Sequence, residues 1–298
     1  MMSALFLSSV AANSGVRPRA AIVTGGTRGI GRGISEALAA SGFDLLVTFN
    51  TDASAAEAAA AELRAAHGCT VECVGGDISL EATRDAIFAC FDKSFKRTHA
   101  LGAVIHNAGQ YVGITSANAD GLAASMYGFG DGSMLDADGK MKLDVMHYYQ
   151  RMYADAYVDL CERGAARMDE ADGGSLIGIS SPGCTLQYNA NLGYDMPGSG
   201  KCVMEYAMRL FAVRCAPKGI NCNVVVPGVT ETDAWGKLAE KRGMKKEELV
   251  AGIASRLSPM GAMQPRQLGD AVAFLCSPEG RIITGVSLPV DGGVHLKS

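Results

Sequence analysis

Short apolar runs and longer amphipathic segments alternate along most of the chain. The apolar runs have the length of strands and lie at residues 20–23, 44–49, 70–74, 103–106, 176–179, 220–226 and 283–290. Segments of helical character lie between or after them, at about 29–41, 54–66, 80–96, 143–168, 201–216, 236–257 and 267–276. Strands that alternate with helices pair in parallel and are covered on both faces. The pattern therefore predicts an α/β fold, a Rossmann-type doubly wound parallel sheet of about seven strands with helices on both faces.

A glycine-rich turn joins the first predicted strand to the first predicted helix. It reads Thr24-Gly-Gly-Thr-Arg-Gly-Ile-Gly31, and its glycines at 25, 29 and 31 permit a tight turn and a close approach of the backbone to a ligand. The helix N-terminus that follows offers unpaired N–H groups and a partial positive charge. Because a strand that turns through glycines into a helix forms a phosphate cradle, we expect a nucleotide at this turn.

Two segments depart from the alternation. Residues 110–140 contain six glycines and little apolar periodicity, which predicts a long loop insertion. The acidic residues Asp131, Asp136 and Asp138 lack the spacing and the closing Glu of an EF-hand, so we expect no metal site there. Residues 1–18 form the second segment, an expected flexible N-terminal extension ahead of a single domain at 19–298.

Composition narrows the choice of partners. The chain is 48% hydrophobic and 19% charged, with a net charge of −4. Nucleic acids and anionic membranes require clustered Lys and Arg, so we expect a small-molecule substrate instead. Nine cysteines without a Cys-x-x-Cys pair indicate free thiols in a reducing compartment and favour the cytoplasm. The acid-free start of the chain, with Arg17 and Arg19, leaves an organelle as the alternative.

From about residue 19 to 293 the chain resembles the short-chain dehydrogenases/reductases. The resemblance rests on the order of its motifs, which are the glycine turn, Asp77-Ile78, Asn107-Ala108-Gly109, Ile179-Ser180-Ser181, Lys201, Pro217-Lys-Gly-Ile220, Asn223, Pro227-Gly-Val-Thr-Glu-Thr232 and Asp291-Gly-Gly293. It implies an NAD(P)(H)-dependent oxidoreductase that forms a homodimer or homotetramer. It also implies a dinucleotide that lies across the carboxyl ends of the strands. The implied cofactor-binding residues are Gly25, Thr27, Arg28, Gly29, Ile30, Gly31, Asn50, Asp77, Ile78, Asn107, Ala108, Gly109, Lys201, Pro227, Gly228, Val229 and Thr232.

The residues at the end of the second strand bear on the choice of cofactor. An acid there would hydrogen-bond the adenosine ribose and favour NAD(H). Here the position corresponds to Phe49, followed by Asn50 and Thr51, with Asp52 close behind. Arg28 in the glycine turn can pair with a 2′-phosphate. We therefore favour NADP(H) over NAD(H).

The catalytic segment departs from the usual spacing of the family. The resemblance implies a Ser that orients the substrate carbonyl, a Tyr that transfers a proton, and a Lys that lowers the pKa of the Tyr and holds the nicotinamide ribose. These roles fall to Ser181, Tyr194 and Lys201, with Tyr188 as the alternative to Tyr194. The usual Tyr and Lys are four residues apart, whereas Tyr194 and Lys201 are seven apart and Pro197 stands at the usual Tyr position.

The helix at 143–157 contains no Asn, which the family uses to support a proton-relay water. Tyr153 and Gln150 are the candidates for its place. Residues 230–262, which include Trp235, correspond to the substrate lid of the family. We expect His106 to be a buried residue at a strand end and not a catalytic base.

Three functions follow from these observations. The first is a reductase acting on a carbonyl of a small or acyl-type substrate, or a dehydrogenase acting on the matching alcohol. The second is an enoyl-thioester reductase, because Tyr-x6-Lys resembles the spacing of that branch of the family. The third is a catalytically weak nucleotide-binding sensor or structural subunit, which the altered catalytic segment leaves open.

Overall fold

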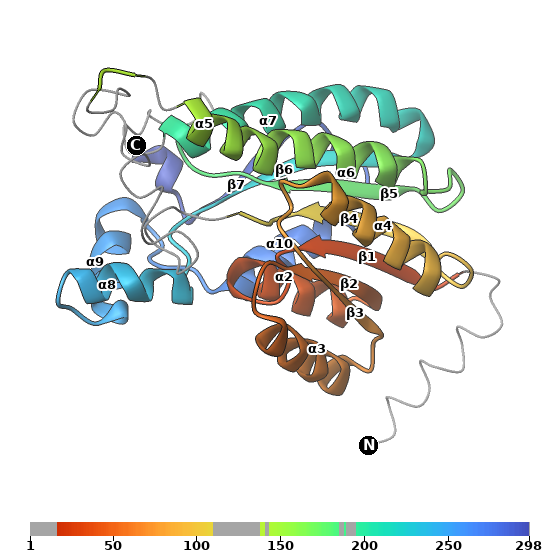
Figure 1. Cartoon of the computed structure of the whole chain (residues 1–298), viewed down its shortest axis with the longest axis horizontal. Coiled ribbons are helices and arrows are strands. Elements are labelled where there is room, and N and C mark those ends of the chain that lie inside the picture. Colours follow the sequence, from red (N-terminus) through yellow and green to blue (C-terminus); the bar gives the residue numbers. More distant parts are fainter. Residues whose placement is uncertain (1–16, 110–137, 141–142, 185–187, 189–194, 298) are drawn as a thin grey trace.

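The computed structural model describes residues 17–109, 138–140, 143–184, 188 and 195–297 (Figure 1). Most of the predicted extension at 1–18 and of the predicted loop at 110–140 lies outside these residues, as does Tyr194. The strands are β1 (Arg19–Thr24), β2 (Phe43–Phe49), β3 (Val71–Gly75), β4 (Ala100–His106), β5 (Gly174–Ile179), β6 (Ile220–Pro227) and β7 (Ser287–Val290). They form one parallel sheet in the order β3-β2-β1-β4-β5-β6-β7. The predicted seven-stranded doubly wound sheet is confirmed.

Helices cover both faces of the sheet (Figure 1). They are α2 (Gly29–Ala40), α3 (Ala53–His67), α4 (Glu81–Ser94), α5 (Leu143–Gln150), α6 (Ala156–Ala165), α7 (Asp195–Cys215), α8 (Gly236–Lys241), α9 (Lys246–Leu257) and α10 (Pro265–Leu275). Shorter turns are the π-helical η3 (Arg151–Asp155) and the 3-10 segments η5 (Ala216–Lys218), η6 (Asp233–Trp235) and η7 (Val294–Leu296). Helices α4 to α7 lie on one face, and α2, α3 and α10 lie on the other.

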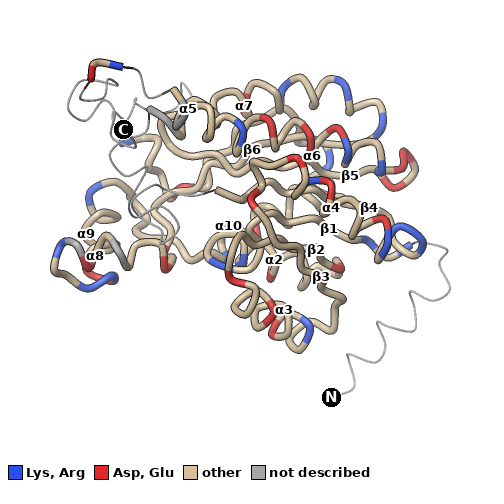
Figure 2. The backbone as a smooth tube through the Cα atoms, viewed as in Figure 1, with Lys and Arg blue, Asp and Glu red and all other residues tan. Residues whose placement is uncertain are grey.

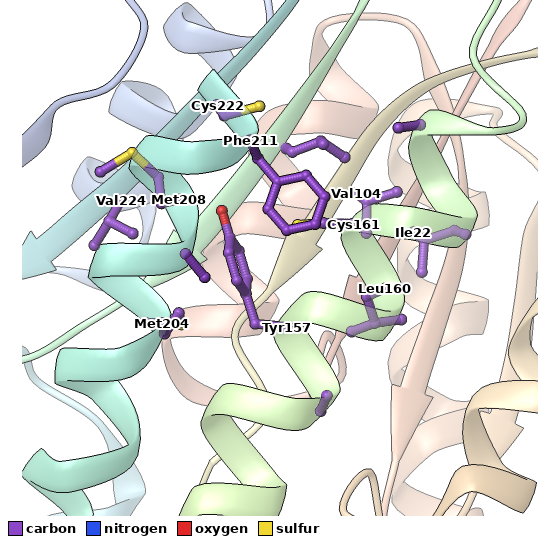
Figure 3. Close-up of a cluster of buried hydrophobic side chains, with 14 of the residues drawn as sticks. Ile22, Val104, Tyr157, Leu160, Cys161, Met204, Met208, Phe211, Cys222 and Val224 are labelled. Carbon is purple, nitrogen blue, oxygen red and sulfur yellow. The ribbon is translucent and has the colours of Figure 1, made fainter. Parts of the chain in front are cut away.

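Each face of the sheet has its own hydrophobic core. Along β1, Ile22 points to one face while Ala21 and Val23 point to the other, because side chains alternate along a strand. Figure 3 shows the first core, where Tyr157 of α6 reaches toward Phe211 of α7. The two rings meet edge to face with centroids 6.3 Å apart. These cores fix α6 and α7 against the sheet and so position the residues that they carry.

The predicted helix at 143–168 is not continuous. It is divided into α5 and α6 by the π-helical turn η3, in which the N–H of Ala156 bonds the carbonyl of Arg151. A π turn adds one residue to a helical turn and shifts the side chains that follow. The apolar periodicity of the segment does not reveal this extra residue.

The last predicted strand is shorter than 283–290. The strand begins at Ser287, because Gly285 has a φ of 77°, in the left-handed region, which interrupts the extended backbone. Before that point the segment contacts β6 through single bonds, from the N–H of Gly285 to the carbonyl of Cys222 and from the N–H of Cys222 to the side-chain oxygen of Thr284. The predicted helix at 236–257 is likewise divided into α8 and α9, which lie at one end of the sheet (Figure 1).

Charged side chains are distributed over the helices and connecting segments rather than along the strands (Figure 2). Along the tube, positions of Lys and Arg are interspersed with positions of Asp and Glu. Among the helices that the structure describes, none combines the length and the apolar character needed to cross a membrane.

Candidate functional site

The carboxyl ends of the strands bring the predicted motifs to one edge of the sheet. The glycine turn follows β1, Asn107 to Gly109 follow β4, Ser180 and Ser181 follow β5, and residues 228–232 follow β6. All these strands are parallel, so their ends meet on the same side. Asn50 and Asp77 lie at the ends of β2 and β3 on that side.

The glycine turn and the Asn107 segment are joined by a set of hydrogen bonds. The hydroxyl of Thr24 accepts the N–H groups of Asn107 at 3.0 Å and of Ala108 at 2.9 Å. The amide of Asn107 donates to the carbonyls of Thr24 and Gly25. A Cβ at Gly31 would lie 2.0 Å from the carbonyl oxygen of Gly25, so only glycine fits there. The backbone on both sides of the predicted pyrophosphate site is therefore held in place before a ligand arrives.

His106 is buried at the end of β4, as expected, and contacts the Thr24 hydroxyl of this hydrogen-bonded set. Its Nε2 donates to the carbonyl of Met152 at 3.0 Å, and its Nδ1 lies 3.1 Å from the hydroxyl of Thr24. Burial lowers the pKa of His106 to about 3. The ring is therefore neutral, with its proton on Nε2, and Thr24 donates to Nδ1. His106 is tied on both nitrogens, which leaves it no proton to exchange with a substrate.

The rim of the site carries the residues on which the predicted choice of dinucleotide depends. Arg28 is exposed, has an extended backbone and immediately precedes α2. Asn50 and Thr51 are exposed at the end of β2. Asp52, the nearest acid, caps α3 by accepting the N–H of Ala55 at 2.9 Å. The carboxylate nearest to this strand end, that of Asp52, is therefore engaged by the backbone of α3.

Lys201 is the buried charged group of the site. It is only 6% exposed, and its Nζ donates to the carbonyl of Ile179 at 3.1 Å, the carbonyl of Ser180 at 3.2 Å and the Oγ of Ser181 at 3.0 Å. Burial lowers the pKa of Lys201 to about 8. The structure therefore brings two of the three predicted catalytic residues, Ser181 and Lys201, into direct contact.

Tyr153 lies beside Lys201 in the position where the sequence lacks the Asn of the family. Lys201 Nζ is 4.6 Å from the centroid of the Tyr153 ring, a cation–π contact. The same ring stacks on Tyr149 and lies against Gly109, where a Cβ would come within 2.7 Å of the Tyr153 hydroxyl oxygen. Of the two candidates for the Asn position, Tyr153 and Gln150, the structure brings Tyr153 to the lysine.

Tyr188, the alternative proton donor, has a different partner. Its hydroxyl donates to Asp291 Oδ2 at 2.8 Å. Burial and the neighbouring carboxylate raise the pKa of Tyr188. Asp291 also accepts the N–H groups of Gly293 and His295, so this carboxylate ties Tyr188 to the turn that follows β7.

The segment after β6 reaches back to the glycine turn. A Cβ at Gly29 would lie 3.5 Å from Cγ2 of Thr232, which places Thr232 over the start of α2. Trp235 donates its indole N–H to the carbonyl of Thr230 at 2.8 Å. Trp235 packs with Val229 and Val250 of α9 in a small separate core. Of the predicted residues Pro227 to Thr232, Thr232 thus borders the glycine turn.

The remaining predicted cofactor residues follow β3. Asp77 accepts a hydrogen bond from the Tyr148 hydroxyl at 3.2 Å and another from the N–H of Ser79, while Ile78 is buried.

Within the described ranges, no group of three or more His, Cys, Asp or Glu side chains is arranged to hold a metal ion.

One buried charged residue next to this site was missed from the sequence. Glu205 lies four residues after Lys201 on α7 and is 7% exposed. The spacing of four, one helical turn, was the available signal. It carries little information by itself, since many exposed helix pairs share it.

Comparison with known proteins agrees with this geometry. The family model described as Enoyl-(Acyl carrier protein) reductase matches residues 25–295. The 3-oxoacyl-[acyl-carrier-protein] reductase FabG of Aquifex aeolicus is 27% identical over 277 residues, 93% of this chain and 97% of that protein. The 1-cyclohexenylcarbonyl-CoA reductase of Streptomyces collinus is 28% identical over 284 residues, 94% of this chain and 88% of that protein.

A solved structure shares the fold. L-sorbose reductase from Gluconobacter frateurii, complexed with NADPH and L-sorbose, superposes with a TM-score of 0.77 at 21% identity, covering 95% of this chain and 98% of that one. The order of motifs, the sheet topology and the family match over most of the length agree. The chain therefore belongs to the short-chain dehydrogenase/reductase family.

Proposed function

We propose that this protein is an NADP(H)-dependent reductase that acts on a carbonyl of a small or acyl-type substrate, or oxidises the matching alcohol. The observation that carries the proposal is the contact between Lys201 Nζ and Ser181 Oγ at 3.0 Å. It lies at the edge of the sheet where the glycine turn would hold a dinucleotide. A hydroxyl beside a buried ammonium is suited to orient and polarise a substrate oxygen.

The residues at the rim support a phosphorylated dinucleotide. Arg28 is exposed and able to pair with a 2′-phosphate, Asn50 adds no negative charge, and Asp52 is occupied as a helix cap. Gly25 to Gly31 and the N-terminus of α2 would hold the pyrophosphate. When bound, NADP(H) supplies the hydride.

The chain's own groups would control the substrate oxygen. Ser181 would donate its hydroxyl proton in a hydrogen bond to that oxygen. Tyr194 would transfer a proton to it, and Lys201 would lower the pKa of the phenol by its positive charge. Tyr194 is preferred to Tyr188 because the Tyr188 hydroxyl is engaged with Asp291. Residues 230–262 would act as a lid that excludes water. The hydrogen bond from the Trp235 indole to the carbonyl of Thr230 would fix the start of this segment.

A second candidate is reduction of the carbon–carbon double bond of an enoyl thioester. The seven-residue step from Tyr194 to Lys201 favours it, and so does the name of the Streptomyces collinus relative. Ser181 favours the carbonyl instead, because its hydroxyl has a direct role at a carbonyl oxygen. The buried Ser181–Lys201 pair disfavours the third candidate, a nucleotide-binding subunit without turnover.

Self-association is part of the proposal. Helix α7 exposes an apolar stripe of Val203, Tyr206, Leu210 and Val213, and Val158 of α6 lies partly exposed nearby. The spacing of three and four residues puts the stripe on one helix face. An exposed apolar face of this kind suits a homodimer or homotetramer. All nine cysteines are free, which supports a cytoplasmic location.

NADPH consumption tests the reaction. A panel of ketones, 3-oxoacyl thioesters and enoyl thioesters would be assayed with wild type, Tyr194→Phe, Tyr188→Phe and Lys201→Ala. We expect wild type to turn over a carbonyl substrate. Tyr194→Phe and Lys201→Ala should abolish this turnover, and Tyr188→Phe should largely retain it. Turnover of enoyl thioesters alone would favour the second candidate. Tight NADPH binding without turnover on any substrate would contradict the enzymatic proposal.

A further inference from the structure

A second buried charged side chain lies one helical turn beyond Lys201. Each carboxylate oxygen of Glu205 accepts a serine hydroxyl, Oε1 that of Ser180 and Oε2 that of Ser287 at 2.9 Å. In the part of the chain that the structure describes, no Lys, Arg or His lies within ion-pair distance of it. A carboxylate this deeply buried is costly unless its contacts serve a purpose.

The contacts of Glu205 connect three elements around Lys201. Glu205 is on α7, Ser180 directly follows β5 and Ser287 begins β7. Ser180 is also a ligand of the lysine, since its carbonyl accepts Lys201 Nζ at 3.2 Å. Glu205 therefore fixes the strand end whose oxygens surround the Lys201 ammonium.

The charges of Glu205 and Lys201 also favour each other. Burial raises the pKa of Glu205, and the hydroxyls of Ser180 and Ser287 together with the charge of Lys201 act to lower it. Burial lowers the pKa of Lys201, and the negative charge of Glu205 acts to raise it. In a low-dielectric interior such a pair interacts strongly without direct contact.

The other groups facing the lysine do not replace this charge. His106 on β4 is neutral, and Tyr153 on η3 presents its ring face to the ammonium. The Cys184 thiol, after β5, favours the ammonium only when it is ionised, and its hydrogen bond with Cys202, together with burial, raises its pKa. Tyr188 lies within the field of Glu205, and burial and its contact with Asp291 raise its pKa, so it is neutral at pH 7. The hydrogen bond with Cys184 lowers the pKa of Cys202 to about 7, but the Cys202 charge is not among those that shift the pKa of Lys201.

We propose that Glu205 is a positioning residue that holds the Ile179–Ser181 strand end around Lys201 and supplies the negative charge that stabilises the lysine's ammonium form. The inference rests on the proposed function, because it assigns Glu205 to the same site. Glu205 acts through Lys201 and Ser180 and does not itself contact the reacting atoms.

The direct test is the titration of Lys201 by NMR in lysine-labelled full-length protein. The Lys201 signal is assigned by its absence in Lys201→Met. We expect Glu205→Gln to lower the Lys201 midpoint by about one pH unit, because it removes the charge and keeps the side-chain volume. Glu162→Gln, which removes a surface carboxylate paired with Arg214, is the matched control and should leave the midpoint unchanged.

The interaction is reciprocal, which provides a second variant. If Glu205 favours the Lys201 ammonium, removal of that ammonium in Lys201→Met must raise the midpoint of Glu205 by a similar amount. This measurement, on the carboxyl carbon of Glu205, remains available should Glu205→Gln fail to fold. An unchanged Lys201 midpoint in folded Glu205→Gln, or an unchanged Glu205 midpoint in Lys201→Met, would overturn the proposal.

Turnover gives an independent reading. With the midpoint lowered by one unit, kcat/KM of Glu205→Gln should fall about fivefold at pH 8 and by less than about twofold at pH 6.5. An equal loss at both pH values would indicate a structural role alone and contradict the proposal. If wild type reduces no substrate while the NMR midpoints shift, the proposed function fails and the role of Glu205 stands.

Discussion

The ammonium of Lys201 and the hydroxyl of Ser181 lie 3.0 Å apart, although 20 residues separate them in the chain. Lys201 projects from α7, and Ser181 lies just beyond β5. Two backbone carbonyls of the same strand end complete the surroundings of the ammonium. The position of the Lys201 ammonium is therefore fixed by three hydrogen bonds to one strand end.

Removal of the Ser181 hydroxyl should impair catalysis and spare cofactor binding. Ser181→Ala is expected to lower kcat/KM for the carbonyl substrate about 100-fold, the usual effect of losing one donor to a developing oxyanion. The NADPH Kd should change less than about twofold. Steady-state kinetics and NADPH fluorescence give the two readings.

Ser175→Ala is the matched control for this substitution. Ser175 lies on the same strand, is also buried, and donates to the carbonyl of Leu275 away from the site. It should leave kcat/KM nearly unchanged. Equal losses in both variants would mean that Ser181 only supports the strand.

Activity should decline as the pH rises through about 8, the pKa of Lys201. The decline should not come from unfolding. The unfolded lysine has a pKa of about 10.4, so between the two values the unfolded state binds more protons and this group adds stability as the pH rises. Measurement of kcat/KM and of urea unfolding from pH 6 to 10 separates the two effects. A fall of both together, or equal pH profiles of unfolding in wild type and Lys201→Met, would argue against this assignment.

His106 should make the protein sensitive to acid. Its native pKa of about 3 lies below the value near 6.5 of an unfolded histidine, so its contribution is complete above 6.5 and is lost as the pH falls toward 3. At pH 5 the expected loss is about 2 kcal/mol relative to pH 7. The free energy of unfolding in urea at these two pH values measures it. The His106→Gln variant, less stable at pH 7, should show a shallower acid dependence; parallel profiles would contradict the prediction.

Arg28 and Asn50 should set the choice of dinucleotide. Arg28→Ala is expected to raise the Kd for NADPH by 10- to 100-fold, roughly the value of a charge-assisted phosphate contact, and to leave NADH unaffected. Asn50→Asp should weaken NADPH further by repulsion and improve NADH binding. Fluorescence titration with both nucleotides checks these shifts.

Arg32 provides the control for Arg28. It lies one helical turn further along α2 and is already paired with Glu36 and Glu62. Arg32→Ala should therefore leave the preference unchanged. Equal effects of Arg28→Ala on NADPH and NADH would remove Arg28 from the phosphate site.

Helix α7 should carry the self-association surface. Tyr206 and Leu210 are 63% and 57% exposed on its apolar stripe. The double variant Tyr206→Glu/Leu210→Glu is expected to shift the protein to monomers, because burying two carboxylates in an apolar contact is unfavourable. Light scattering after size exclusion measures the mass. A monomeric wild type would exclude a self-association surface on α7. An unchanged oligomer in the variant would place that surface elsewhere.

The sequence by itself determined the layout of the fold and the edge that carries the site. Strand and helix periods are local properties, and the parallel arrangement follows from their alternation. The glycine turn at residues 24–31 and the strand-end motifs were readable for the same reason, since each depends on a few consecutive residues. The elements that were read less well, at 143–168 and 283–290, are those where a π turn or a glycine with a left-handed backbone interrupts a regular pattern.

Only the tertiary structure decided which groups surround Lys201. Tyr153 reaches it across η3 and α7, and Ser181 reaches it across β5 and α7, contacts that span 48 and 20 residues of chain. The hydroxyl of Tyr188 donates to Asp291, which is 103 residues away. These pairs depend on how helices seat against the sheet and on the extra residue of a π turn, which no local period encodes. The sequence therefore predicted which lysine belongs to the site. The packing of the molecule decides where its ammonium lies and how burial shifts its pKa.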